Sequence, residues 1–581
     1  MGKKGRSRKP DTSSAPSHEP GSLKIATLPG SDAPMLVFSN FMELLVVLFC
    51  TVYSLFCLDA YLLDSLHLKL SVINLSVMLG AEVLLFWYSA GKKTVLYSEI
   101  PPVLYGLLVF LTSFGISLII SPTLLPNNWS ADYPNHYILV DFLSIHEQLP
   151  LLSSGLGEMV QYPFGPSLFT SVMAKITSQP LMTAMGFWAA VIIAIITVAI
   201  YLLARELLSR LSGEKSLTDM AGLVSVFMVF SVPVYFLDQY CGNFYYSMIF
   251  GELLVLLSLL ALMKMEKGAA SWFFIFLLAD VGIIFSYTLF ILIPFATLII
   301  VAFLKPDKFR FLTDRNTVIA GLLVVLLFFI FSYQRMAIGT HILSYEGLTV
   351  ELSILNFNII FIVLVIAGII LCLKMVPGYP RSALAVSNGV LFAEYCGFIF
   401  LNQFGIIALY YANKIFYLFI LVLSVSACIP VFVALRYIRM NQFRTIAAVG
   451  IIGVIGIFSL FVALNYPLPE KPVVTNEDTI FAQKAEAYLH ANDIPYENLS
   501  ITTGELKGYW LGLLLHMDKG YAQKKFLDNA TAFSDWLKDP DARYVAGEMV
   551  NASYPEYFEM GGVRLQIVVR EGQKVLIRKA D

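Results

Sequence analysis

Long apolar segments recur along most of this 581-residue chain, from Val37 to Leu464. Each extends over roughly 18 to 25 residues, the length that a helix rising about 1.5 Å per residue needs to cross the hydrocarbon core of a bilayer. Only 14% of the residues are charged, whereas about a quarter are charged in a soluble globular domain. The sequence therefore predicts a polytopic α-helical membrane protein.

The apolar segments predict about thirteen membrane-spanning helices. We place them at residues 37–62, 68–89, 101–121, 181–204, 218–237, 243–264, 271–287, 288–304, 317–335, 354–374, 383–402, 414–437 and 445–465. With the N-terminus in the cytoplasm, most Lys and Arg residues before residue 466 fall on the cytoplasmic side, as the positive-inside rule requires. An odd number of spans then places the C-terminal segment on the extracytoplasmic side of the cell membrane.

Changes in composition divide the chain into three parts. Residues 1–33 are basic and contain many Ser and Pro without an apolar core, which is typical of a disordered cytoplasmic tail. Residues 34–465 contain the predicted spans, and within them residues 122–180 form one long outer loop. A linker with several Pro residues begins at Tyr466, and residues 466–581 are expected to form an extracytoplasmic domain.

The polar C-terminal part has the pattern of a small α/β domain. Apolar residues recur with helical spacing at 477–491 and 522–537, and strand-like runs occur at 499–502 and 563–569. We therefore expect a mixed α/β fold there.

The outer loop contains the residues that most suggest chemistry. Asp132 precedes Pro134, which suits the first turn of a helix, so we expect Asp132 at a helix start and His136 in the first turn. Backbone N–H groups hold a carboxylate ionised there, and partial burial raises its basicity, as a general base requires. Alternatively, Asp132 is only a helix cap and His136 a surface histidine. The two residues could also hold a divalent metal ion, and no other cofactor is indicated.

Positive charge is scarce at the outer ends of the predicted spans. Arg335 ends one span, and Lys414 begins another directly after the segment that contains Tyr410 and Tyr411. Basic side chains at such positions commonly extend to lipid headgroups. The alternative is that Arg335 and Lys414 bind an anionic headgroup, with the tyrosines supplying hydrogen bonds.

Acidic residues in membrane segments are energetically costly and therefore informative. Asp59, near the outer end of the first span, and Asp238 are expected to border the same outer cavity as Asp132. Three other acids are expected instead to satisfy neighbouring helices: Glu82, Asp280 and Glu394.

Three features together resemble the fold-C glycosyltransferases, which are integral membrane enzymes with a lipid-linked sugar donor. The features are an early outer loop with an acid, many spans and a C-terminal outer domain. The Asp-x-x-x-His sequence at Asp132 and the Tyr-Pro-Phe-Gly sequence at Tyr162 are similar to the first outer loop of that superfamily. The Tyr-Tyr-x-x-Lys sequence that ends at Lys414 is similar to segments that approach the lipid phosphate in some members.

The resemblance implies an inverting transfer of a hexose or pentose from a polyprenyl- or dolichyl-phosphate donor to an acceptor hydroxyl on the extracytoplasmic face. Asp132 would be the catalytic base, and the donor phosphate would be bound by Lys414, Arg335 and Tyr411. The substrate pocket would also include His136, Asp59, Asp238 and Tyr162. The partners implied are the lipid-linked donor, membrane lipids and a glycan, lipid or protein acceptor.

Other classes of function fit the sequence less well. The net charge of −2 does not indicate a nucleic-acid partner, and no phosphate-binding glycine loop, zinc-protease motif or Gly-x-Ser-x-Gly is present. The Trp-Trp-Asp-x-Gly motif of oligosaccharyltransferases is also absent. The alternatives that stay open are a transporter or flippase of lipid-linked glycans, although no internal repeat is found, and a membrane scaffold.

Overall fold

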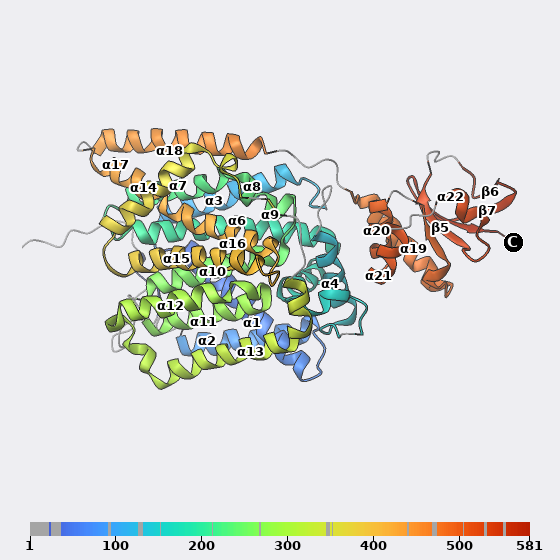
Figure 1. The fold of residues 1–581 in the computed structure, drawn as a ribbon, viewed down its shortest axis with the longest axis horizontal. Helices are drawn as coiled ribbons and strands as arrows, with labels where there is room; N and C mark the ends of the chain where they lie inside the picture. The colour runs from blue at the N-terminus through green and yellow to red at the C-terminus, as the bar shows by residue number, and fades with distance from the viewer. Residues whose placement is uncertain are drawn as a thin grey trace, which may run out of the picture.

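The computed structural model describes residues 23–24, 36–90, 94–125, 132–151, 153–211, 213–265, 269–343, 349–350, 352–438, 441–466, 473–502, 505–527, 532–549 and 554–580. These residues form a bundle of long helices and a separate C-terminal domain built on a sheet. A layer that includes α4 (Tyr133–His146) lies at the end of the bundle that faces the C-terminal domain (Figure 1). We call this end of the bundle the α4 end.

The bundle is built from apolar helices along the described chain. They are α1 (Phe41–Ser65), α2 (Val72–Ala90), α3 (Ile100–Ile120), α6 (Leu181–Leu208), α7 (Lys215–Phe230), α10 (Tyr246–Lys264), α11 (Ala269–Ser286), α12 (Leu292–Leu304), α13 (Arg315–Leu343), α14 (Ile359–Met375), α15 (Gly378–Asn402), α16 (Leu409–Ser426), α17 (Cys428–Arg436) and α18 (Asn441–Leu464). Short 3-10 helices in the connections are η3 (Thr288–Ile291), η4 (Pro306–Lys308), η5 (Arg310–Thr313) and η6 (Ile354–Asn356).

Length and composition confirm a multi-pass α-helical membrane protein. Among the described residues, eight helices are long and apolar enough to cross a membrane, with α16 and α17 counted together. A ninth forms if α7 is joined to α8 (Pro233–Phe236) and α9 (Asp238–Cys241), across a bend of 78°. Four further apolar helices are shorter. Apolar helices thus follow the predicted spans, and the count of thirteen crossings stays a prediction.

The first span begins later than the sequence predicts. Leu36–Phe38 form β2, which pairs in parallel with β3 (Thr94–Ser98). Asn40 then caps α1, because its side chain accepts a 2.9 Å hydrogen bond from the backbone N–H of Glu43. The predicted start inside β2 is therefore wrong. The described part of the predicted disordered tail, Leu23–Lys24, forms β1 and pairs with β3 as well.

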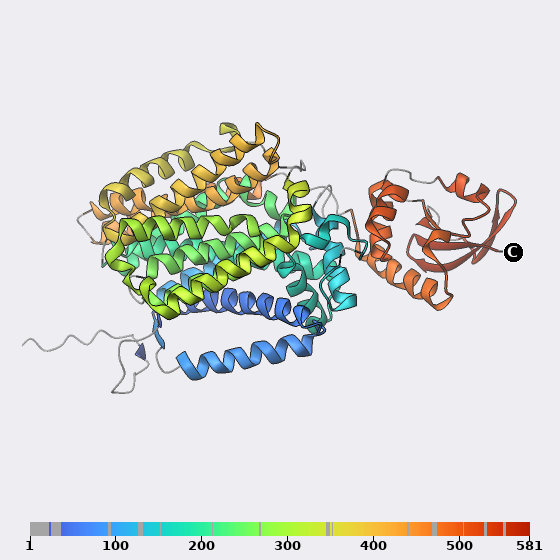
Figure 2. The same ribbon diagram turned by 60° about the horizontal axis from the view of Figure 1, so that its bottom comes forward.

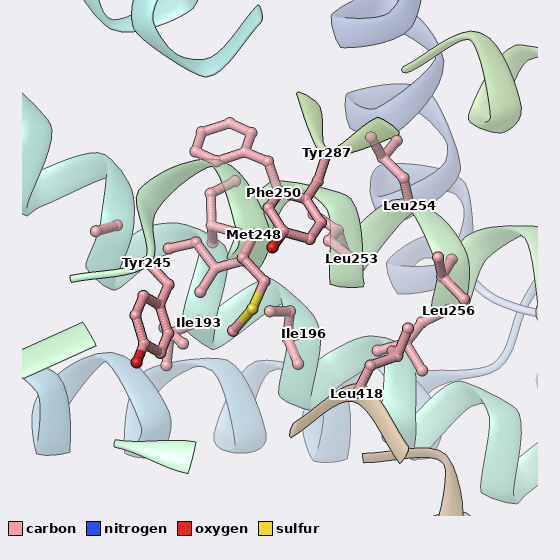
Figure 3. Close-up of a cluster of buried hydrophobic side chains, with 14 of the residues drawn as sticks. Ile193, Ile196, Tyr245, Met248, Phe250, Leu253, Leu254, Leu256, Tyr287 and Leu418 are labelled. Carbon is pink, nitrogen blue, oxygen red and sulfur yellow. The ribbon is translucent and has the colours of Figure 1, made fainter. Parts of the chain in front are cut away.

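The central helix of the bundle, α10, is buried along its whole length. Neighbouring helices approach it where glycines leave room: a Cβ at Gly251 would lie 2.7 Å from the Cβ of Tyr287, and one at Gly282 would meet Leu254 at 2.9 Å. Small residues allow such close approach between apolar helices. Large side chains fill the remaining space, and Figure 3 shows several of them, among them Ile193, Ile196, Met248 and Phe250.

The predicted outer loop is largely helical. After α4 come η2 (Gly157–Gln161) and α5 (Gly165–Thr177), and both α4 and α5 have a Pro in their first turn. A Cβ at Gly165 would lie 2.7 Å from the hydroxyl oxygen of Tyr53, so α5 packs tightly on α1. The predicted helix start beside Asp132 is confirmed, and the loop is a fixed layer on the bundle.

The C-terminal domain has a five-stranded mixed sheet, as the α/β prediction requires. Its strand order is β4 (Leu499–Ile501), β5 (Tyr544–Glu548), β8 (Lys574–Lys579), β7 (Val563–Glu571) and β6 (Tyr557–Met560). The pair β4 and β5 is parallel and the other neighbours are antiparallel. Its helices are α19 (Asn476–Ala491), η7 (Tyr496–Asn498), α20 (Glu505–Leu514), α21 (Lys519–Ala522) and α22 (Phe533–Lys538). The turned view in Figure 2 also shows the bundle and this domain as distinct parts.

One predicted helix of this domain is wrong in extent. The segment 522–537 is not one helix, because a π-helical turn, η8 (Gln523–Leu527), ends before α22 starts at Phe533. Trp536 of α22 is fully buried in a small core with residues of the sheet, including Val545 and Leu565. This packing fixes α22 against the sheet as a separate element.

Candidate active site

Asp132 lies directly before α4 and turns its side chain away from the helix. The carboxylate makes no hydrogen bond to the backbone N–H groups of α4, so both the helix-cap interpretation and the expected stabilisation by those groups are wrong. Asp132 Oδ2 instead accepts a 2.9 Å hydrogen bond from the hydroxyl of Tyr410 and lies 3.3 Å from Lys414 Nζ. The acid is therefore held by two residues of α16.

Lys414 is the buried partner in this ion pair. Its side chain is 2% exposed, whereas that of Asp132 is 21% exposed. The ammonium lies 4.1 Å from the ring centroid of Tyr410, 4.2 Å from that of Tyr245 and 5.7 Å from that of Tyr287. Aromatic faces attract a desolvated cation. Because Lys414 points inward to a carboxylate and three rings, it does not extend to lipid headgroups.

His136 is buried beside the same group of tyrosines, so the surface-histidine interpretation is also wrong. Its ring centroid lies 5.2 Å from that of Tyr162 and 5.8 Å from that of Tyr246. Its Nδ1 atom has no hydrogen-bond partner among the described residues. Burial lowers the pKa of His136 to about 4, and the charge of Lys414 acts in the same direction while Asp132 opposes it. The imidazole is therefore neutral at neutral pH.

Two further predicted residues, Tyr162 and Tyr411, belong to this group. Tyr162 follows η2, and burial raises its pKa well above the usual value, so the phenol stays protonated. Tyr411 has its ring centroid 5.0 Å from that of Tyr410 and lies within electrostatic reach of Asp132. Both phenols can therefore act as hydrogen-bond donors near the acid.

Asp238 connects to the site through intermediate residues. Its carboxylate accepts hydrogen bonds of 2.5 Å from Asn243, 3.0 Å from Tyr466 and 3.5 Å from Tyr417. The ring of Tyr417 lies 5.6 Å from that of Tyr245, which contacts the lysine of the ion pair. Asp238 thus supports the aromatic wall of the site, and no described contact joins it to Asp132.

Asp59 and Arg335 are not brought to the ion pair by any described contact. Asp59 is fully buried in α1 and interacts with Glu82 of α2. Arg335 lies on α13, but its side chain is outside the described residues. Their assignment to the substrate pocket and to the donor phosphate stays a prediction.

The divalent metal ion considered for Asp132 and His136 would need further ligands close to them. Among the described residues, no group of three or more His, Cys, Asp or Glu side chains gathers to hold a metal ion.

Sequence reasoning missed the aromatic wall and one cation. Tyr245, Tyr246 and Tyr287 come from the start of α10 and from the break after α11, where the sequence shows only tyrosines near span ends. Figure 3 shows Tyr245 and Tyr287 among the buried side chains around α10. The cation is Lys519 of the C-terminal domain, within electrostatic reach of Asp132. No local pattern marks it, because the docking of the domain brings it there.

The group as a whole combines a proton acceptor with a site for negative charge. The carboxylate of Asp132 is partly exposed, and it is flanked by a buried ammonium, phenol donors and a neutral imidazole. General base catalysis and stabilisation of an anionic leaving group require these components close together.

No protein-family model matches the chain, and no curated protein matches it. Among solved structures, the chain is similar to ArnT from Cupriavidus metallidurans bound to undecaprenyl phosphate, with 11% identity and a TM-score of 0.48. The match covers 82% of this chain and 97% of that chain. The apo state of ArnT matches over the same shares with 10% identity and a TM-score of 0.46.

Proposed function

We propose that the protein is an inverting glycosyltransferase that moves a sugar from a polyprenyl-phosphate donor to an acceptor hydroxyl. The observation that carries the proposal is the Asp132–Lys414 pair at the α4 end of an apolar helical bundle. A base beside a buried cation matches the two charge changes of this reaction. The membrane helices suit a donor with a long isoprenoid chain.

The proton transfer and the charge stabilisation of the proposed reaction are each assigned to one residue. Asp132 accepts the proton of the acceptor hydroxyl while that oxygen attacks the anomeric carbon. The bond between the anomeric carbon and the phosphate oxygen breaks, and its electron pair stays on the phosphate. Lys414 stabilises the additional negative charge on the leaving group. Attack from the face opposite the leaving group inverts the anomeric configuration.

The ion pair of the free protein also controls when the base is available. Lys414 has one carboxylate partner in the described part of the chain, and a donor phosphate competes for the same ammonium. Movement of the ammonium toward the phosphate removes its attraction on Asp132 Oδ2, so the carboxylate accepts the acceptor proton more readily. The base is thereby released in the complex that contains the donor.

His136 and the tyrosines orient the substrates in this proposal. Among the described residues, no partner satisfies the buried Nδ1 atom of His136, which is costly unless a ligand does so. A sugar hydroxyl is a suitable partner for a neutral imidazole, while Tyr162 and Tyr411 donate hydrogen bonds to sugar or phosphate oxygens. Arg335 is proposed as a further phosphate ligand from α13.

The proposed reaction takes place on the extracytoplasmic face, where the C-terminal domain also lies. This orientation is supported by the concentration of Lys and Arg residues in the connections at the opposite side. The acceptor would be a cell-surface glycan, a glycolipid or a glycoprotein. The sugar would be a hexose or a pentose.

A flippase for lipid-linked glycans is the second candidate, and one observation favours it. The segment α7 to α9 is broken, with a bend of 78°, and broken helices form the binding sites of many transporters. The break is followed by Pro233, and Asp238 after it is tied to Tyr417 and Tyr466. The break thus leads into the wall of the same site, which also fits substrate binding by a transferase.

A reconstituted assay separates these two functions. Purified protein in liposomes is given polyprenyl-phosphate hexoses and pentoses with labelled sugars, together with glycan acceptors. A transferase releases polyprenyl phosphate and forms a product with inverted anomeric configuration, both of which are measurable by chromatography and NMR. Movement of intact donor across the bilayer without breakdown would instead establish the flippase.

A further inference from the structure

The C-terminal domain is docked on the helix that follows Asp132. Trp510 of α20 is buried, and its rings lie 5.8 Å from Tyr133 and 6.0 Å from Tyr137. Beyond α20, His516 Nδ1 lies 2.5 Å from Asp141 Oδ2. Contacts from two successive segments of the domain thus fix it on α4.

A third contact brings the start of α21 to the loop before η2. Gly155 has a φ of +73°, and a Cβ there would collide with the carboxylate of Asp518. The backbone of the loop therefore touches the residue that caps α21, since Asp518 also accepts a hydrogen bond from the N–H of Tyr521. Lys519 is the next residue. This close approach positions its side chain at the boundary between the domain and η2.

Lys519 lies within electrostatic reach of two carboxylates, one of which is Asp132 of the candidate site. Its side chain is half-buried, and the charged groups that act on it are Glu158 of η2 and Asp132. Burial lowers the pKa of Lys519, and both carboxylates oppose this effect. No hydrogen bond or ion pair of Lys519 occurs within the described residues, in contrast to Lys414, which is held by Asp132.

A half-buried ammonium without a close partner is costly in the free protein, because it has lost part of its hydration. An anionic ligand restores the lost interaction. In the proposed reaction, the phosphate of the donor carries about one negative charge as a diester and approaches two as a monoester, since the second pKa of a phosphate monoester is near 6. Lys414 is itself paired with Asp132, so it does not match all of this additional charge.

We propose that Lys519 is a further cation for the phosphate of the lipid-linked donor, beside Lys414 and Arg335, so that the bundle and the C-terminal domain build the anion site jointly. This inference rests on the proposed glycosyltransferase function. Lys519 approaches from the water-facing side, and Lys414 from within the bundle. The domain is then a working part of the site, and its undocking removes a phosphate ligand.

The test measures binding of undecaprenyl phosphate to the full-length protein in nanodiscs. A ligand bond to a charged group contributes about 1.5 to 3 kcal/mol, which corresponds to about a 10- to 100-fold change in affinity. Lys519→Met is expected to weaken binding by at least about tenfold, and Lys519→Arg to restore most of it. The matched control is Lys524→Met, an exposed lysine of the same domain, which is expected to bind as the wild type does. Hydrogen exchange of α20 reports whether the domain stays docked.

The outcomes distinguish this inference from the function on which it rests. Weakened binding in Lys519→Met with α20 still protected supports Lys519 as a phosphate ligand. Unchanged affinity in Lys519→Met, while Lys414→Met loses binding, overturns the inference and leaves the transferase proposal intact. If the wild type prefers undecaprenyl phosphate no more than phosphatidic acid, both proposals fail. Weakened binding that appears only with loss of α20 protection also overturns it, because Lys519 then acts through docking alone.

Discussion

Lys414 Nζ lies 3.3 Å from Asp132 Oδ2, and this pair joins the loop layer to α16 across 282 positions of sequence. The two side chains differ in burial, since the lysine is enclosed and the acid is partly open. An incoming anion therefore reaches the pair from the side of Asp132. The pair supplies the base and the cation of the proposed reaction from two separate elements.

Replacement of the buried lysine separates the role in binding from the role in folding. Lys414→Met keeps the apolar stem and removes the charge, so we expect about a 10- to 100-fold weaker apparent affinity for a polyprenyl-phosphate donor. The thermal midpoint should change little, because Asp132 is partly hydrated and does not become a buried unpaired charge. Lys175→Met, which breaks the half-exposed pair with Glu147, is the matched control. Donor affinity equal in all three proteins would count against the phosphate role.

The histidine next to the base predicts a pH dependence of stability. The pKa of His136 is lowered to about 4 in the folded protein, whereas an unperturbed histidine has a pKa near 6.5. The unfolded chain thus binds a proton more readily, so this residue's contribution is present above about pH 6.5 and is lost as the pH falls toward about 4. His136→Phe should flatten the decline of the unfolding midpoint over this interval, measured in detergent by differential scanning fluorimetry. An unaltered pH profile in the variant would contradict the buried neutral imidazole.

Docking of the C-terminal domain should weaken as the pH rises. Burial lowers the pKa of His516, but the hydrogen bond to Asp141 and the charges of Asp141 and Glu486 outweigh this effect, so the net shift is upward. The charged pair is therefore complete below the unperturbed pKa and is lost as the pH passes through the raised value. Hydrogen exchange of α20 and α4 should increase with pH beyond its intrinsic rise. His516→Gln should remove this additional increase, and the same increase in the variant would show that another group controls docking.

Loss of the buried indole should uncouple the domain without unfolding it. Trp510 contacts Tyr133 and Tyr137 of α4, and replacement of a buried Trp by Ala costs about 3 to 5 kcal/mol. Trp510→Ala should therefore expose the linker and the domain face of α4 to protease. The control is Trp536→Phe, which changes the separate core formed by α22 and the sheet. Equal protease resistance of Trp510→Ala and the wild type would show that the docking depends on other contacts.

The sequence predicts the membrane part well because its signals are local. Runs of apolar residues mark helices wherever they occur, and Pro134 marks the start of α4. The predicted helix bounds are wrong where tertiary contacts determine the local structure. Residues 36–38 are apolar enough to extend the first span, but pairing with β3 makes them a strand. The segment 522–537 has helical spacing, yet burial of Trp536 against the sheet separates α22.

The candidate site shows the same limit. Asp132, His136 and Lys414 stand out because charge is rare near membrane segments, and these residues do gather. The partner of the acid was missed, since a helix start suggests its own N–H groups and gives no indication of Tyr410. Nothing local distinguishes Lys519 from other surface lysines. Its position near Asp132 follows only from the docking of the C-terminal domain. Lys519 comes more than one hundred residues after Lys414 in the sequence.

Sugar transfer by Asp132 variants tests the central claim most directly. In liposomes with a polyprenyl-phosphate sugar and acceptor, Asp132→Asn should fold normally and bind undecaprenyl phosphate, yet lose transfer by about 100-fold or more, because the amide cannot accept the acceptor proton. The control Glu147→Gln changes an acid at the other end of α4 and should transfer sugar at the normal rate. Near-normal transfer by Asp132→Asn would contradict the assignment of Asp132 as the base.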